Sequence, residues 1–324
     1  MHLHADIRAL RDDDGPQRAA QQALGVALDA WRARPGPQRL EAELAQFTRG
    51  GPIDEFPLLA TLFEPHSADA AVFVRGLIDG FCAALERAPL GHLPLRHFTD
   101  GTVSTLMLAR SGEASLALAA IDGPRLALRA APGSVSFAPC ETWDHILAGE
   151  ASADLVSRGE VVGSGTTLTR KTLHLKPGGV TVRDGAREAL VIRVVSGCLV
   201  NLRLQRRRTV EVTREFSLGD GTLLHQAAGT ARDSRLELTA ALLGRMGRAD
   251  AAPLLGAMAQ ENGSPALRWQ ALRECLGLDT REGFLTLGTI ARSPHDPLAV
   301  PAGALRAQLI EQHPQLAGIE PCPL

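Results

Sequence analysis

The sequence predicts an α+β protein in which a β-sandwich or jelly roll lies between two helical regions. In residues 95–235, apolar residues alternate in short runs that Gly- and Pro-containing turns separate, which is typical of many short strands. Within this region, an Asp-Gly start, an alternating run and a Ser-Gly turn occur twice, at 100–112 and at 184–197. On both sides, in residues 1–94 and 236–324, apolar residues recur at the spacing of one helix face. These three regions are the predicted domains.

Length, composition and charge indicate a soluble globular protein. The chain has 324 residues, a hydrophobic content of 45%, a charged content of 22% and a net charge of −2. Two or three domains with a sizeable core fit this length, and the charge balance argues against nucleic-acid and membrane partners. No run approaches the roughly 18 apolar residues of a membrane span, and no secretory signal is visible. The five cysteines lack Cys-x-x-Cys spacing, so we expect free thiols and a cytoplasmic location.

The N-terminal region predicts three helices. Two shorter ones, over 19–33 and 38–47, are separated by Pro35-Gly36-Pro37. Ser67 can cap a third helix. The apolar residues that share one face of this helix are Val74, Leu77, Ile78, Phe81 and Leu85. Two prolines within 88–95 end the helical pattern and mark a domain boundary.

In the middle region, alternation and turn residues define the strands. Leu116, Leu118 and Ala120 alternate, and so do Val210 and Val212. Turns are indicated at 122–124, 177–179 and 219–221. Because both copies share the Asp-Gly start and the Ser-Gly turn, we expect Asp100–Ala120 and Asp184–Leu204 to form equivalent strand pairs, as an internal duplication requires.

The C-terminal region predicts helix pairs. Leu238, Leu242 and Met246 share a face, Ser264-Pro265 has the form of a capped helix start, and Asp279 to Glu282 has the form of a capping box. The pattern from residue 251 to 274 resembles a HEAT repeat. The C-terminal region has room for about two such repeats, whereas three are normally needed for a stable stack of repeats. We therefore expect the apolar faces here to dock on the β domain or on a second protomer, with Trp269 near the contact.

The order of elements in the middle region resembles the cupin pattern. Gly112 and Gly197 match the glycine of the first cupin motif, and Gly133, Pro139 and His145 follow the second motif in the first copy. The resemblance implies a duplicated jelly-roll barrel in which histidines and a glutamate bind one divalent metal. Thr105 and Leu190 stand where the glutamate of each copy is expected, and the His-x-His positions carry no histidine. The resemblance therefore implies the scaffold without most of its metal ligands.

Our leading interpretation is a non-catalytic binding or interaction protein, regulatory in role, on a cupin-like scaffold that has lost its metal centre and needs no cofactor. Its ligand-binding residues are Trp143, His145 and His97, at the mouth of the barrel. The alternative is a metal-dependent cupin enzyme, an oxygenase or isomerase, whose divalent metal is held by His97, His145 and Glu141. The expected partner is a small-molecule ligand or a protein, and homo-oligomer formation stays open.

Each of these residues also has a structural interpretation. His97 and His145 can be edge or turn histidines whose ring nitrogens bind backbone groups, and Trp143 can belong to the core. Arg203, Arg206, Arg207 and Arg208 form the dense basic run of the chain. This run predicts either a solvated hairpin or a patch that binds an anion or an acidic partner.

Overall fold

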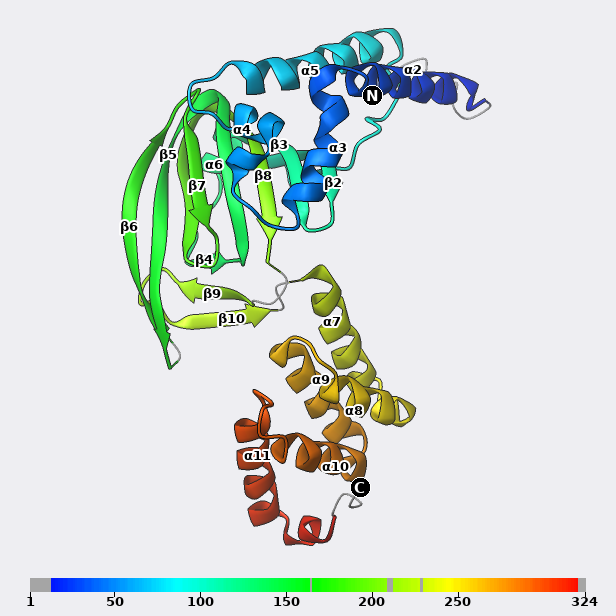
Figure 1. Ribbon diagram of the computed structural model, residues 1–324, viewed down its shortest axis with the longest axis vertical. Coiled ribbons are helices and arrows are strands. Elements are labelled where there is room, and N and C mark those ends of the chain that lie inside the picture. The colour runs from blue at the N-terminus through cyan, green and yellow to red at the C-terminus, as the bar shows by residue number, and fades with distance from the viewer. Residues whose placement is uncertain (1–12, 164, 209–211, 228–229, 320–324) are drawn as a thin grey trace. The chain divides into compact units, whose positions relative to one another are not determined.

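The computed structural model describes residues 13–163, 165–208, 212–227 and 230–319 (Figure 1). Its chain divides into two compact units. The first unit comprises Met1–Arg208 with Phe216–Thr222, and the second comprises Thr209–Glu215 with Leu223–Leu324. Antiparallel sheets and helices both occur, which confirms the predicted α+β class.

The first unit begins with helices whose starts follow the prolines. Pro occupies one of the first two positions of four of them, where its fixed φ suits a helix and its missing N–H costs nothing. Ser67 lies beside the start of a further helix, and its Oγ accepts a hydrogen bond from Asp69 N at 3.1 Å. The helices of this unit are α2 (Gly15–Arg32), α3 (Pro35–Phe47), the 3-10 turn η1 (Ile53–Glu55), α4 (Pro57–Leu62), α5 (Asp69–Arg87) and α6 (Gly123–Ala127).

The strands form one large antiparallel sheet and one small sheet. The large sheet has the order β1-β2-β3-β8-β5-β6, with β7 also paired to β5, and the small sheet has the order β10-β9-β4. The strands are β1 (His97–Thr99), β2 (Val103–Ser111), β3 (Ala114–Asp122), β4 (Ser134–Phe137), β5 (Cys140–Val162), β6 (Gly165–Leu175), β7 (Val180–Asp184), β8 (Glu188–Arg207), β9 (Thr213–Ser217) and β10 (Leu223–Ala227).

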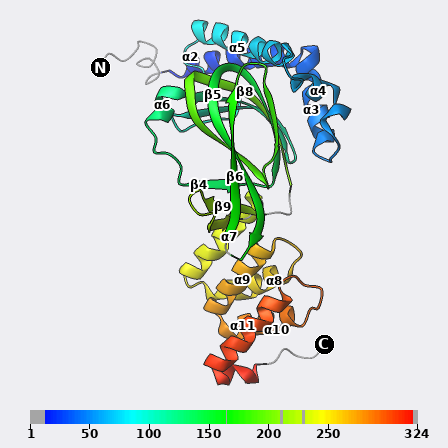
Figure 2. The same ribbon diagram turned by 90° about the vertical axis from the view of Figure 1, so that its left-hand side faces the viewer.

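The long strand β5 bends so far that its two ends meet the same short segment. Gly185 N donates to Cys140 O at 2.8 Å, and Arg158 N donates to Arg187 O at 2.9 Å. The register of β5 against β8 shifts three times between Ile146 and Ala153, and such bulges increase the local bend. The sheet therefore curves into a barrel-like sandwich, as the ribbon in Figure 2 shows.

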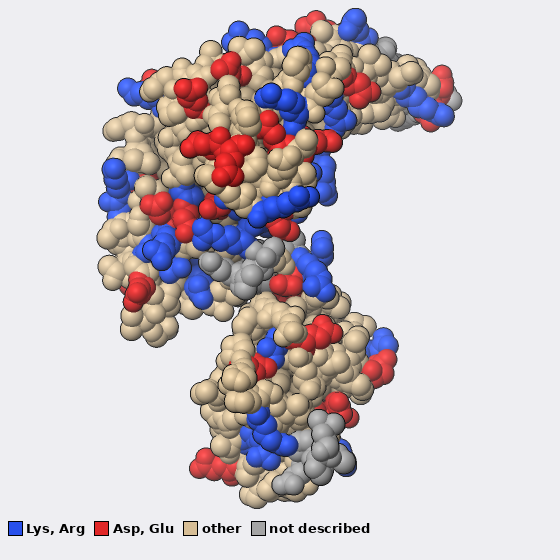
Figure 3. All heavy atoms as spheres, viewed as in Figure 1, with Lys and Arg blue, Asp and Glu red and all other residues tan. Residues whose placement is uncertain are grey.

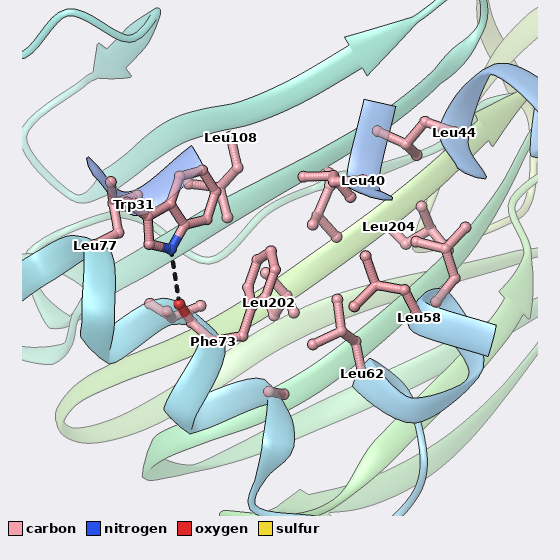
Figure 4. Close-up of a cluster of buried hydrophobic side chains, with 14 of the residues drawn as sticks. Trp31, Leu40, Leu44, Leu58, Leu62, Phe73, Leu77, Leu108, Leu202 and Leu204 are labelled. Atoms are coloured by element: carbon pink, nitrogen blue, oxygen red, sulfur yellow. Dashed lines mark hydrogen bonds between the residues drawn. The ribbon is translucent and has the colours of Figure 1, made fainter. Parts of the chain in front are cut away.

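Helices α2–α5 cover the outer face of this curved sheet. Trp31, Leu40 and Phe73 of the helices pack in one buried cluster with Leu202 and Leu204 of β8 (Figure 4). Because this core is shared, the structure does not separate residues 1–94 from the sheet, contrary to the boundary that we expected near residue 94. The prolines at that point end α5 without ending the domain.

The structure corrects the predicted equivalence of the two β copies. Residues 103–122 are two strands that pair as a hairpin around Gly112. Residues 188–207 are instead one strand, β8, which continues through Ser196 and Gly197. Gly197 has a φ of +70°, so its freedom serves a bend within a strand and does not close a hairpin.

The second unit has a core of its own. The helices pack as neighbouring pairs, and Asp279 caps one of them through Glu282 N at 3.0 Å, whereas the Ser264 side chain makes no cap. Leu272, Phe284, Leu287 and Ile290 are buried inside this unit, so most of the apolar face that we expected to need a docking surface is covered within it. The helices are α7 (Ala231–Arg245), η2 (Ala249–Ala251), α8 (Ala252–Gln260), α9 (Pro265–Leu278), α10 (Thr280–Ala291), α11 (Ala299–Gln312) and η3 (Pro314–Gly318).

Over the described parts of the chain, no helix has the length and apolar character needed to cross a membrane.

Candidate functional site

Strands β5, β7 and β8 place a group of polar side chains on the inner face of the sheet, which is turned away from α2–α5. Successive side chains of a strand point to opposite faces. Trp143 and His145 of β5 contact the helices, so Asp144 between them points inward. The register sets Asp144 opposite Arg203 of β8 and opposite Thr181 of β7.

Asp144 is the centre of this group and is only 1% exposed. Its Oδ2 accepts a hydrogen bond from Arg183 Nη1 at 2.6 Å, and its Oδ1 accepts one from Arg203 Nε at 2.7 Å. Asn201 Nδ2 also donates to Oδ1. We call Asp144, Arg183, Asn201 and Arg203 the Asp144 cluster.

The two guanidinium groups keep Asp144 ionised. Burial by itself raises the pKa of this carboxyl, but the charges of Arg203 and Arg183 outweigh it and hold the pKa below its ordinary value. One carboxylate therefore faces two permanent positive charges, which leaves the Asp144 cluster with a net charge of +1.

Polar groups continue on the inner face around the cluster. Gln205 Nε2 donates to Thr142 Oγ1 at 3.3 Å. The Oγ1 of Thr181 is buried and has no hydrogen-bond partner among the described residues. Native structures rarely leave such a hydroxyl unsatisfied, so this one indicates a place for a further polar group. The Arg203 side chain is 33% exposed, which gives the cluster access to solvent.

The Asp144 cluster does not fit a metal ion. Both carboxylate oxygens of Asp144 already bind arginines, which are permanently charged donors and cannot act as ligands. A divalent cation also needs several N, O or S ligands that converge on one point. Within the described ranges, no group of three or more His, Cys, Asp or Glu side chains is placed to hold one.

The structure does not bring together the residues that we proposed for a metal or a ligand. His97, Leu106, Leu118, Leu202 and His145 lie in one cross-strand row. Four strand spacings of about 4.8 Å therefore separate the two histidines along the sheet. His97 is exposed on the edge strand β1, whereas His145 is buried and donates from Nδ1 to Leu62 O of α4 at 2.7 Å.

Trp143 belongs to the core beneath the helices. It is buried and packs edge to face on Phe47 of α3, with ring centroids 5.5 Å apart. Glu141, on the same outer face, binds Arg206 and Arg208. Neither residue lines a barrel mouth, so the structural interpretation of Trp143 is the one that its surroundings support.

The basic run divides between the two faces of the sheet. Arg206 Nε donates to Glu141 at 2.7 Å, and its guanidinium lies 4.3 Å from the centre of the Phe47 ring. Arg208 pairs with Glu141 and Asp184, while Arg203 points to the opposite face. Arg207 is exposed next to them. On the face of the first unit seen in Figure 3, acidic and basic side chains lie interspersed.

Sequence reasoning missed Arg183 and Asn201 as members of a site, and it did not link Asp144 with them or with Arg203. Period-two alternation already set Asp144 apart from Trp143 and His145 and placed Arg203 with Asn201 on one face of its strand. Without the strand register, however, nothing joined residues almost sixty positions apart.

Similarity to known proteins is limited to structure. No protein-family model matches the sequence, and no curated protein is similar to it. The chain is similar to oxalate decarboxylase, with 14% identity and a TM-score of 0.27, over 39% of this chain and 31% of that one. It is also similar to KdgF from Halomonas sp., with 13% identity and a TM-score of 0.25, over 35% of this chain and 89% of that one. This chain thus spans about a third of the length of oxalate decarboxylase.

A cupin superfamily protein from Desulfitobacterium hafniense is similar as well, with 18% identity and a TM-score of 0.23, over 34% of this chain and 83% of that one. The β region of this chain is a curved antiparallel sheet that bends over on itself, and helices precede and follow it in the sequence.

Cysteine reactivity provides a first test of this geometry. Cys82 and Cys198 are exposed, whereas Cys140 and Cys275 are buried. Burial raises the pKa of the Cys140 thiol, and it raises that of Cys275 to about 11, with help from Glu282 and Asp279. Because the thiolate is the reactive form, we expect iodoacetamide at pH 8 to modify Cys82 and Cys198 well before the other two. Peptide mass mapping over time checks this, and early modification of Cys140 would contradict the placement of the inner face.

Proposed function

We propose that this protein is a non-catalytic binding protein that holds a small anion at the Asp144 cluster. The observation that carries the proposal is the imbalance of charge: two buried or half-buried guanidinium groups share one carboxylate. A charge without a counter-charge is costly in a low-dielectric interior, so a second anion beside Arg183 and Arg203 is stabilising.

The arginines have donors left for such a ligand. A guanidinium carries five N–H groups in a planar fork that matches a carboxylate or a phosphate. Arg183 gives Asp144 one of its terminal nitrogens, and Arg203 gives it two nitrogens. The Thr181 hydroxyl is a further donor close to the same carboxylate. The chemistry that these groups share is that of a small carboxylate or phosphate.

Binding of inorganic phosphate and of succinate to the full chain, measured by calorimetry at fixed ionic strength, tests the proposal. We expect Arg203→Met to weaken binding at least about tenfold, because it removes a charge-assisted contact. Arg203→Lys keeps the positive charge but lacks the planar guanidinium fork, so its anion affinity is expected to lie between those of the wild type and Arg203→Met. Arg193→Met is the matched control, since Arg193 lies on the same strand and pairs with Asp154. All variants are first shown to be folded by circular dichroism.

Two outcomes contradict the proposal. One is a folded wild-type protein that binds neither anion, and the other is an Arg193→Met variant that loses as much affinity as Arg203→Met. Competition between phosphate and succinate for one site then separates the two ligand chemistries, because the tighter ligand defines the class.

The finer predictions from the sequence remain part of this proposal. They are a regulatory role, a HEAT-like character of the second unit and a cytoplasmic location. The last is that a protein partner or a second copy of the chain binds to the helices of the second unit. Leu238 and Leu242 of α7 support the last of these, because both are exposed, as is Met246 directly after that helix.

A further inference from the structure

A separate pocket of about 260 Å³ lies among helices α2–α5 of the first unit. Its walls are mainly apolar, and Figure 4 shows four of the residues concerned, Trp31, Leu58, Leu62 and Phe73, in one cluster. Two charged residues, Arg34 and Asp69, line the same pocket. The remaining members include Pro37 and Val72. None of these residues belongs to the Asp144 cluster.

The apolar wall is held rigidly. The rings of Trp31 and Phe73 meet edge to face with centroids 5.2 Å apart, and Trp31 Nε1 donates to Phe73 O at 3.1 Å (Figure 4). Gly36 lies against Phe73, since a Cβ at this glycine would sit 3.4 Å from the ring. A wall of fixed aromatic rings loses little conformational entropy when an apolar group binds to it.

A second glycine makes room for Arg34. A Cβ on Gly76 would lie 1.9 Å from Arg34 Nη1, so the guanidinium rests directly on α5 where a side chain is missing. Glycine within a helix costs roughly 1 kcal/mol relative to alanine. Gly76 therefore has a local purpose, which is to let the Arg34 side chain approach the helix beside the pocket.

The two charges of the pocket are free to meet a ligand. The side chain of Arg34 makes no ion pair or hydrogen bond with any residue that the structure describes. The Asp69 carboxylate accepts a hydrogen bond from Ser67 Oγ at 2.8 Å, and it forms no ion pair with Arg34 or another described residue. One cation and one anion thus border a single apolar pocket without neutralising each other.

We propose that this pocket binds a free apolar α-amino acid. The ligand's carboxylate pairs with Arg34, its ammonium group pairs with Asp69, and its side chain packs on Trp31 and Phe73. The volume of about 260 Å³ lies just below the roughly 300–1,000 Å³ of pockets that hold drug-sized molecules, so it suits a smaller ligand such as an amino acid. A fatty acid has no group for Asp69, and an amine has none for Arg34. This binding goes beyond the proposed anion site and depends on different residues.

Calorimetry with the full chain and L-leucine, L-methionine or L-phenylalanine tests the proposal. We expect at least one of them to bind, and we expect 4-methylpentanoate and L-leucinamide, which each lack one of the charges, to bind at least about tenfold more weakly than leucine. Arg34→Met and Asp69→Asn are each expected to weaken leucine binding by about the same factor. Arg75→Met, which removes an exposed arginine of α5 outside the pocket, is the control and is expected to leave binding unchanged.

Three results would overturn the proposal. The first is that none of the three amino acids binds at concentrations up to about 10 mM, where even a weak affinity would be detected. The second is that 4-methylpentanoate binds as tightly as leucine. The third is that a folded Arg34→Met variant binds leucine as the wild type does. A Val72→Trp variant, which fills the pocket from its exposed rim, serves as a second check, and it too is expected to lose leucine binding.

Discussion

Replacement of Gly149 by alanine is expected to destabilise the first unit by more than about 3 kcal/mol, which is above the usual range for a single substitution. Gly149 lies where β5 bends and has a φ of +78°. A Cβ at this position would lie 2.0 Å from the carbonyl oxygen of Cys198 in β8. This neighbour is backbone of the central strand pair, so it cannot move aside as a side chain does. Urea unfolding followed by circular dichroism and tryptophan fluorescence measures the loss.

Gly197→Ala is the matched control for this substitution. Gly197 has a similar φ of +70°, but nothing lies within 4 Å of the position of its Cβ. Only the left-handed backbone is then penalised, at roughly 1–2 kcal/mol. If both variants lose the same stability, the close approach of Cys198 to Gly149 does not set the cost, and the bend of β5 tolerates a wider separation of the strands.

The same two glycines show why the strand boundaries were only partly predictable. Alternation correctly identified β3 from Leu116, Leu118 and Ala120, and Gly112 does close the β2–β3 hairpin. Gly197, which we expected to close a turn, instead lies within β8, and Gly149 lies within β5. A glycine with positive φ serves a turn or a bend within a strand equally well. Local sequence therefore could not show that β5 and β8 continue through them.

The candidate site was hidden for a related reason. His97 and His145 looked like a pair because the cupin pattern places histidines near them, but strand register sets them at opposite ends of a row. Asp144 and Arg203 meet because β5 and β8 are neighbours in the sheet. Such long-range pairing depends on how the whole sheet assembles, which single-sequence periodicity does not contain. The sequence indicated which face of its strand each residue occupies, but it did not indicate which residue of a neighbouring strand lies opposite.

Asp144→Asn is expected to cost about 3–5 kcal/mol, because it leaves the charges of Arg183 and Arg203 without their partner on the inner face. The matched control is Asp154→Asn, which breaks a more exposed ion pair with Arg193 on the same pair of strands and should cost about 1 kcal/mol or less. Urea unfolding at pH 7 measures both. Equal losses would show that the Asp144 cluster is no more sensitive than this partly buried pair.

The pH dependence of this loss follows from the lowered pKa of Asp144. The native carboxyl has a pKa below its ordinary value of 3.8, so its contribution to stability is fully present above that value. The contribution is lost as the pH falls through the native pKa, because the protonated group then no longer balances the arginines. The stability difference between wild type and Asp144→Asn should accordingly stay constant from pH 7 to about 5 and shrink below about 4. A difference that persists unchanged under acid would mean that the asparagine acts through packing.

Replacement of the whole ionic group then separates structure from binding. Buried ion pairs can often be exchanged for apolar residues of similar size without loss of stability. We expect Asp144→Leu combined with Arg183→Met and Arg203→Met to recover most of the stability that Asp144→Asn loses. Anion binding should not return, because the guanidinium forks are gone. If this triple variant is stable and still binds phosphate as the wild type does, the anion site lies elsewhere and the Asp144 cluster only supports the fold.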